Sequence, residues 1–146
     1  MRVIKRKSDE VIEADLNSTS SAVRVKTQSH RDLRVWQKSM SLVVAVYRLT
    51  RTFPRDELFG LTSQMRRSAV SIPSNIAEGH GRLNRREFNQ FLRISRGSMS
   101  ELQTQLEIAA ALNIGDPVHL RQAQEVATEV GKMLLSLLSR VNPNAG

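Results

Sequence analysis

Residues 84–113 read NRREFNQFLRISRGSMSELQTQLEIAAALN, the longest helical pattern in the chain. Apolar and small residues recur here at steps of three or four, which places them on one face of an α-helix. That face carries Phe88, Phe91, Leu92, Ser95, Met99, Leu102, Leu106 and Ala109. Asn84 stands at the N-cap position and Glu87 follows three residues later, close to a capping box. The stretch therefore predicts a helix from Asn84 to about Asn113 with one buried face.

Two more helical patterns precede this one. Residues 32–52 carry two adjacent apolar stripes and end before Pro54, because the residue before a proline is pushed out of the helical region. Residues 56–78 carry an apolar stripe that keeps its phase through Pro73. A proline inside a helix removes one backbone hydrogen bond, so we expect a kink at this position.

Start and stop signals bound the second and fourth helices. Asp56 is a suitable N-cap for the second helix. Gly79 and Gly81 are expected to end it by adopting the left-handed conformation. Asp116 followed by Pro117 is typical of a helix start and predicts a fourth helix that runs almost to the C-terminus.

These patterns define the expected fold class. No segment shows the sustained period of two that is typical of strands. Four amphipathic helices with short connections predict an all-α fold, an antiparallel up-down-up-down four-helix bundle with a proline-kinked second helix. Residues 1–31 have few large apolar side chains and a polar run, so we expect a flexible basic N-terminal tail. Residues 32–146 then form the four-helix bundle domain.

Composition excludes several classes of protein. The chain has 146 residues and no cysteine, which rules out disulfides and thiolate metal sites. No apolar run approaches the length that spans a bilayer and no signal peptide is recognisable, so we expect a cytoplasmic protein with no membrane partner. Three scattered histidines, His30, His80 and His119, form no metal-binding motif. No serine has a convincing base, and we expect no catalytic residue, no metal, no cofactor and no enzyme activity.

The charge distribution favours a polyanionic partner. Lys and Arg total 22 against 14 Asp and Glu, a net charge of +8. Such a balance indicates nucleic acid first, and arginine, whose planar fork suits phosphate, greatly outnumbers lysine. Four arginines of the 84–113 helix share one polar stripe. The predicted nucleic-acid-binding residues are Arg66, Arg67, Arg82, Arg85, Arg86, Arg93 and Arg96. The alternative is that some of them form ordinary surface ion pairs, such as Arg82 with Glu78.

Surplus apolar residues favour self-association. A helix in a monomeric four-helix bundle needs about one apolar stripe, yet the first three patterns carry more. The predicted oligomer-interface residues are Phe59, Val70, Ala77, Ile94, Gly97 and Ile108. An outward glycine inside a helix also suggests that another helix approaches it. The alternative is that broad apolar faces only fill a thick core.

Several motifs resemble one known family. They are DLRVWQK at 32–38, ELFGLTSQMRR at 57–67, SIPSNIAEG at 71–79 and GSMSEL at 97–102. Together they look like the bacterial four-helix-bundle protein family, also called the large-subunit ribosomal RNA intervening-sequence protein family. It is related to the accessory variability determinant of diversity-generating retroelements. The resemblance covers about residues 32–141.

The resemblance implies a bundle that assembles into a ring-shaped homopentamer with a basic surface. Retroelement members partner a reverse transcriptase and bind nucleic acid, whereas other members lie in intervening sequences of ribosomal RNA genes. Our leading hypothesis is a non-catalytic, homo-oligomeric accessory protein that binds RNA or DNA. The alternative is a protein-interaction scaffold whose basic face docks an acidic protein.

Overall fold

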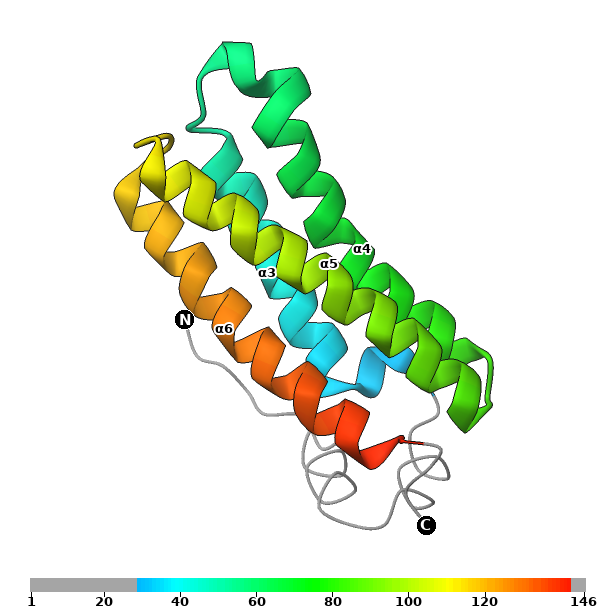
Figure 1. The fold of residues 1–146 in the computed structure, drawn as a ribbon. Coiled ribbons are helices and arrows are strands. Elements are labelled where there is room, and N and C mark those ends of the chain that lie inside the picture. The colour runs from blue at the N-terminus through cyan, green and yellow to red at the C-terminus, as the bar shows by residue number, and fades with distance from the viewer. Residues whose placement is uncertain (1–28, 143–146) are drawn as a thin grey trace.

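The computed structural model describes residues 29–142, and every regular element in that range is helical. Four long helices lie side by side as a helical bundle (Figure 1). They are α3 (Arg34–Thr50), α4 (Ser63–Gly81), α5 (Arg85–Ala111) and α6 (Pro117–Arg140). The short elements are η1 (His30–Asp32), η2 (Arg55–Glu57) and η3 (Leu58–Thr62). No strand occurs within residues 29–142, so the all-α prediction is confirmed.

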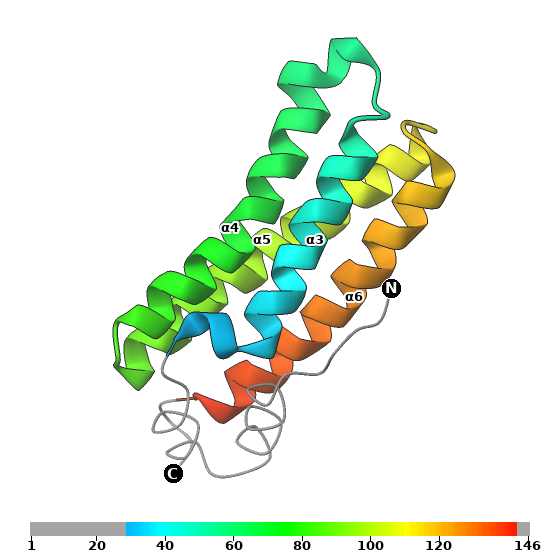
Figure 2. The same cartoon turned by 180° about the vertical axis from the view of Figure 1, so that it is seen from behind.

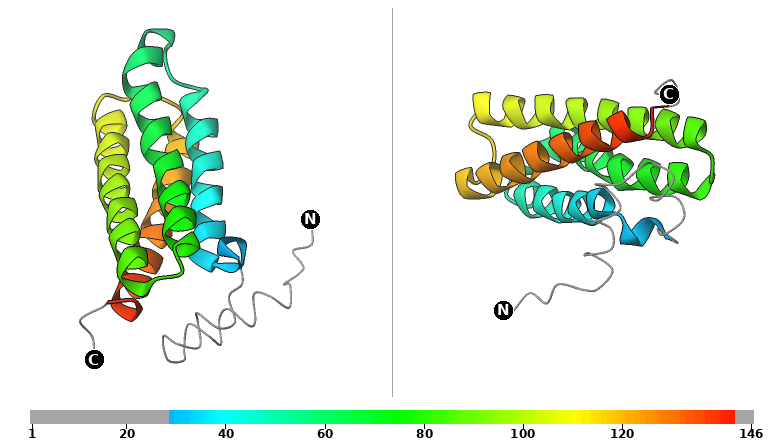
Figure 3. Two further views of the ribbon diagram at one scale, coloured as in Figure 1. Left: turned by 90° about the vertical axis from the view of Figure 1, so that its right-hand side faces the viewer. Right: turned by 90° about the horizontal axis from the view of Figure 1, so that it is seen from below.

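Each long helix packs against two neighbours. Helix α4 contacts α3 and α5, and α6 contacts α3 and α5. The views from behind, from the side and from below show this order (Figures 2 and 3). All four helices contribute aliphatic side chains to one core. Its largest fully buried members are Leu33, Leu42, Val46, Leu49, Met65, Ile72, Ile76, Leu92, Leu102, Leu106, Val130 and Leu134.

Two predicted helix caps are confirmed. The Asn84 side chain accepts a hydrogen bond from the Glu87 amide at 3.1 Å, at the start of α5. Asp116 Oδ1 accepts from the amides of Val118 and His119 at 2.8 and 3.2 Å, at the start of α6. These bonds satisfy amides that have no partner inside the helix, which is why short local signals predicted both positions.

The predicted start of the second helix is wrong. Asp56 lies in η2, and the side chain that caps the following turn belongs to Glu57, which accepts from the Leu61 amide at 3.1 Å. Residues Leu58–Thr62 form a π-helical turn in which Gly60 has non-helical φ and ψ of −108° and −113°. Regular α-helix therefore begins only at Ser63.

The predicted role of the two glycines in ending this helix is also wrong. Gly79 and Gly81 both lie inside α4, and the positive φ of 55° that follows the helix belongs to Leu83. Gly79 is instead buried at the contact with α5. A Cβ atom at this position would lie 2.6 Å from the Cβ of Phe91 and 3.1 Å from the Phe88 ring. A side chain is excluded there because the two helices come too close.

Small polar residues join α4 to α5. The hydroxyls of Ser71 and Ser98 are 2.8 Å apart, and Ser95 Oγ donates to the Ile72 carbonyl at 3.0 Å. Pro73 is buried next to this seam, and α4 continues through it from Ser63 to Gly81. The short side chains let the two backbones approach each other along this seam.

The predicted tail lies mostly outside the described residues, which exclude 1–28 and 143–146. Ser29 caps η1 by accepting from the Arg31 amide at 3.2 Å, and the His30 ring meets the Trp36 ring edge-on, with centroids 5.0 Å apart. Between residues 29 and 142, no helix is both long and apolar enough to cross a membrane.

Candidate nucleic-acid interface

The four predicted arginines of α5 fall into two environments. Arg86, Arg93 and Arg96 are exposed, whereas Arg85 is half-buried. The exposed three follow one another at steps of seven and three residues, so they share one side of the helix. The open part of the predicted stripe therefore consists of three arginines.

Arg85 is committed to an internal contact. Its Nη2 donates to the Arg140 carbonyl at 2.7 Å, in the last turn of α6. Its Nε is buried and has no hydrogen-bond partner among the described residues. Because a helix C-terminus leaves its last carbonyls without internal partners, the Arg85 guanidinium acts there as a cap.

Arg93 is held in place by a neutral group. Its Nε donates to Asn89 Oδ1 at 2.9 Å, and Asn89 is 5% exposed. The amide orients the guanidinium without cancelling its charge. The remaining guanidinium donors of Arg93 can still reach an anion, because arginine offers five N–H groups.

Arg66 and Arg67 of α4 and Arg82, which directly follows that helix, lie in separate surroundings. Arg66 donates from Nε to Thr50 Oγ1 at 2.8 Å, with its guanidinium carbon 4.4 Å from the centroid of the Tyr47 ring. Arg67 is exposed. The predicted pairing of Arg82 with Glu78 is confirmed at 2.9 Å. The structure thus divides the predicted set among α4, α5 and the connection between them, and Arg82 already has an acidic partner.

A groove between α5 and α6 was not predicted. One hollow of about 320 Å³ is lined from α5 by Arg96, Met99, Ser100 and Gln103, and from α6 by Thr128, Gly131, Lys132, Leu134 and Leu135. A second hollow of about 360 Å³ is lined by Gln103, Leu106, Glu107, Gln124, Ala127 and Thr128. Gln103 and Thr128 line both hollows, so the two lie next to each other along one groove between α5 and α6. Sequence periodicity predicts which residues share one face of a helix. It does not predict which polar faces of two helices lie next to each other.

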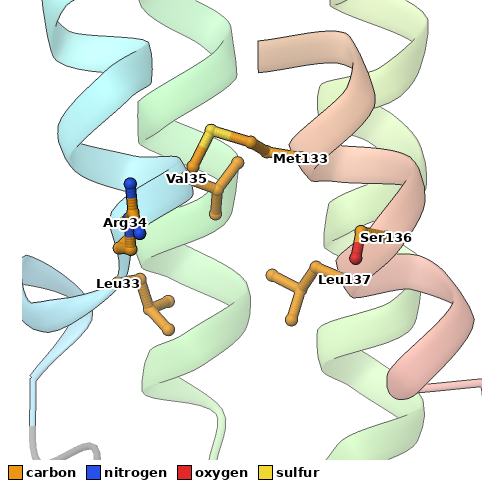
Figure 4. Close-up of a pocket in the computed structure, with 6 residues that line it drawn as sticks. All are labelled: Leu33, Arg34, Val35, Met133, Ser136 and Leu137. Carbon is orange, nitrogen blue, oxygen red and sulfur yellow. The ribbon is translucent and has the colours of Figure 1, made fainter. Parts of the chain in front are cut away.

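A smaller hollow of about 100 Å³ lies where the start of α3 meets the end of α6. Its lining is Leu33, Arg34, Val35, Met133, Ser136 and Leu137, and Leu33 points toward Leu137 (Figure 4). This lining is mostly aliphatic and has no carboxylate, imidazole or thiol. In the part of the chain that the structure describes, no three His, Asp or Glu side chains gather as metal ligands would.

The predicted interface residues lie on three elements. Phe59 is 93% exposed on η3, at one end of the bundle. Val70 and Ala77 lie on α4, where Val70 is exposed and Ala77 half-buried. Ile94, Gly97 and Ile108 are exposed on α5, and a Cβ at Gly97 would meet nothing within 4 Å. The sequence reasoning missed Met40 and Val44 of α3, which are also exposed.

Comparisons with known proteins agree with this architecture. The sequence model of a family described as 23S rRNA-intervening sequence protein matches residues 31–136. A crystal structure of a protein of unknown function from the S23 ribosomal protein family of Bacteroides thetaiotaomicron is similar in fold, with a TM-score of 0.66. It is 24% identical, and the alignment covers 72% of this chain and 95% of that chain. None of the curated proteins matches the chain.

Proposed function

The chain belongs to the 23S rRNA-intervening sequence protein family, and from this premise we propose that it is a non-catalytic accessory protein that binds RNA or DNA. The exposed arginine face of α5, formed by Arg86, Arg93 and Arg96, makes the contacts. The bound groups are phosphates, so binding depends on charge far more than on base sequence.

One observation carries this proposal. Arg86, Arg93 and Arg96 form no ion pair with another described residue, whereas Lys38 pairs with Glu129 and Arg82 with Glu78. The three arginines therefore keep their charge for a partner. A protein that neutralises phosphates releases condensed counterions, and the affinity then falls steeply with salt.

Fluorescence anisotropy with labelled RNA and DNA of mixed sequence, at several salt concentrations, tests the proposal. Arg86→Glu combined with Arg93→Glu should weaken binding to both nucleic acids by about the same factor, because phosphate contacts carry little sequence information. Arg51→Glu combined with Arg55→Glu is the matched control, since both residues are exposed and lie outside α5. If both double variants lose affinity equally, only the net charge matters and the α5 face is not the site.

We further infer an up-down-up-down order, a bend at Pro73 and a ring-shaped homopentamer. Support for the order comes from the short connections, which span residues 82–84 between α4 and α5 and 112–116 between α5 and α6. Support for the assembly comes from the exposed apolar side chains of α4 and α5 and from the family resemblance. A ring repeats the arginine face and so raises the avidity for one strand.

A protein-interaction scaffold is the second candidate, favoured by one observation. Phe59 and Leu58 project from η3 with exposed fractions of 93% and 49%, and exposed apolar groups of this size are typical of protein contacts. The partner would be a protein with an acidic surface. A cytoplasmic reverse transcriptase is one candidate, because the resemblance described above extends to retroelement accessory proteins. Binding of an acidic protein, with no salt-dependent binding of nucleic acid, would favour this candidate.

A further inference from the structure

We propose that the groove between α5 and α6 receives one single strand of nucleic acid. A phosphate lies at the end marked by Arg96 and Lys132, and a base edge faces Gln103 and Gln124. This inference rests on the proposed function and specifies which form of nucleic acid the protein prefers. It also adds α6 to a surface that the sequence assigned to α4 and α5 alone.

The groove has room for a nucleotide. Its two hollows, of about 320 and 360 Å³, are adjacent and share Gln103 on the α5 wall and Thr128 on the α6 wall. The first hollow reaches down to Met99 and Leu134, which are 3% and 0% exposed and belong to the core. Gly131 adds no side chain to the α6 wall, and the Gln103 amide nitrogen lies 3.7 Å from the position that a Cβ of residue 131 would take.

The two ends of the groove differ in charge. Arg96 on α5 and Lys132 on α6 line the first hollow, whose lining contains no carboxylate. Glu129 lies near Lys132 in the sequence, but it pairs with Lys38 of α3 at 2.7 Å and so turns away from the groove. Glu107 lines the second hollow. A phosphate is therefore attracted to the Arg96 end and repelled from the Glu107 end.

The second hollow offers neutral polar groups. Gln103 and Gln124 each carry an amide that can donate and accept, the combination that pairs with base edges. The Thr128 hydroxyl donates to the Gln124 carbonyl at 3.0 Å and remains able to accept. No aromatic side chain lines either hollow, so base stacking contributes little and selectivity among bases is weak.

These contacts fit a single strand rather than a duplex. In a duplex the bases are stacked and paired, and an RNA duplex shows mainly phosphates and 2′-hydroxyls to a protein. Base edges reach side chains in a groove only when the strand is unpaired. A duplex can still bind the exposed Arg86 and Arg93 through its phosphates, which lets experiment separate the two modes.

Two threonines provide a matched test. Thr128 and Thr104 are both exposed, and each hydroxyl donates at 3.0 Å to the carbonyl four residues earlier. Thr128 lines both hollows, and Thr104 lines neither. Thr128→Leu should narrow the groove and weaken binding of single-stranded oligouridine and oligothymidine of about 12 nucleotides, and it adds no aromatic ring on which a base could stack. We expect a loss of about tenfold in affinity, with duplexes of the same length affected less than twofold. Thr104→Leu should change neither the affinity for single strands nor the affinity for duplexes.

A second variant removes charge without adding bulk. Arg96→Gln combined with Lys132→Gln should reduce the slope of log K against log salt for single strands by about 1.4, the value for two lost phosphate contacts. Arg48→Gln combined with Arg51→Gln, both exposed and outside the groove, is the control. Circular dichroism checks that each variant is folded. The threonine variant and the charge variant each test the groove independently, so one folded variant is sufficient.

The outcomes separate the two proposals. If the wild-type protein binds no nucleic acid at low salt, the proposed function fails and the groove proposal fails with it. If the wild-type protein binds but Thr128→Leu and Thr104→Leu bind single strands equally well, only the groove proposal is overturned. An equal loss on single strands and duplexes would also overturn it, because the groove would then not distinguish them.

Discussion

Gly79 shows how one missing side chain sets the distance between two helices. Inside a helix, replacement of glycine by alanine ordinarily stabilises by about 1 kcal/mol. At Gly79 the added Cβ would lie 2.6 Å from the Phe91 Cβ, an atom fixed to its own backbone. We predict that Gly79→Ala reverses the usual sign and lowers the free energy of unfolding by about 1–3 kcal/mol.

Gly81 supplies the control for this prediction. It lies in the same helix, and a Cβ there would meet nothing within 4 Å. Gly81→Ala should therefore leave stability unchanged or raise it by up to about 1 kcal/mol. Urea denaturation of both variants gives the comparison. Equal stabilities would show that α4 and α5 separate easily and that the contact at Gly79 is not a constraint.

Asp116 predicts a pH dependence. Hydrogen bonds from the amides of His119 and Val118 lower the pKa of this carboxyl below its ordinary value of 3.8. The folded state therefore favours the ionised form, so the cap stabilises fully above pH 3.8 and loses this contribution as the pH falls through the lower folded-state pKa. Asp116→Ala should lower the Tm by about 3–6 °C at neutral pH, and by less in acid.

Asp116→Asn separates the cap from its charge. Asparagine is also a good N-cap, and its side chain does not titrate. Thermal melts by circular dichroism at pH 7 and near pH 3 should therefore show a smaller pH-dependent loss for this variant than for the wild-type protein. A difference between wild type and Asp116→Ala that stays constant down to pH 2 would contradict a cap that depends on ionisation.

At the scale of elements, Arg85 joins the start of α5 to the end of α6. Its bond to the Arg140 carbonyl is charge-assisted and half-buried. We predict that Arg85→Ala lowers the free energy of unfolding by about 1–2 kcal/mol. Arg86→Ala, at the exposed neighbouring position, should cost less than about 0.5 kcal/mol.

Binding should show the opposite ranking for these two arginines. Arg86 is free to reach a phosphate, whereas Arg85 already donates to a carbonyl. Anisotropy should therefore show a larger loss of RNA affinity for Arg86→Ala than for Arg85→Ala. If Arg85→Ala loses more affinity while remaining folded, its guanidinium leaves α6 to contact the ligand.

The helix ends show which features the sequence could predict. Asn84 and Asp116 cap amides two or three residues away, so their roles are readable from local spacing. The irregular start of the second helix depends on the Glu57 bond and on the backbone of Gly60, and many turns are compatible with that sequence. The contact of Arg85 spans 55 residues, and helix periodicity contains no information about it.

The same limit applies to surfaces that two helices share. Periodicity correctly predicted that Arg86, Arg93 and Arg96 are exposed, because exposure depends only on the phase of one helix. It could not predict that Lys132 of α6 lies across from Arg96, since that depends on how the two helices are rotated against each other. The sequence could therefore predict which helix carries the exposed arginines, but it could not predict the groove that α5 forms with α6.

At the scale of the whole molecule, the exposed apolar residues predict assembly. Ile94 and Ile108 are 51% and 41% exposed on α5, with Gly97 between them, and Val70 is 41% exposed on the adjacent α4. A second copy that covers these side chains would remove their apolar surface from water. We predict that light scattering coupled to size exclusion gives about five times the 16.4 kDa mass of one chain. A monomer mass at every concentration would rule out the assembly.

Gly97→Leu locates the contact. In a single copy a Cβ at this position meets nothing within 4 Å, and leucine forms helix better than glycine, so one bundle should become slightly more stable. Loss of mass in the same scattering experiment, with unchanged helical content, would then come only from a clash with a neighbouring copy. Gly81→Leu, equally unobstructed at the end of α4, controls for the added apolar surface. If Gly97→Leu keeps the wild-type mass, the subunit contact avoids this part of α5, and the exposed residues of α3 and α4 become the surface to test.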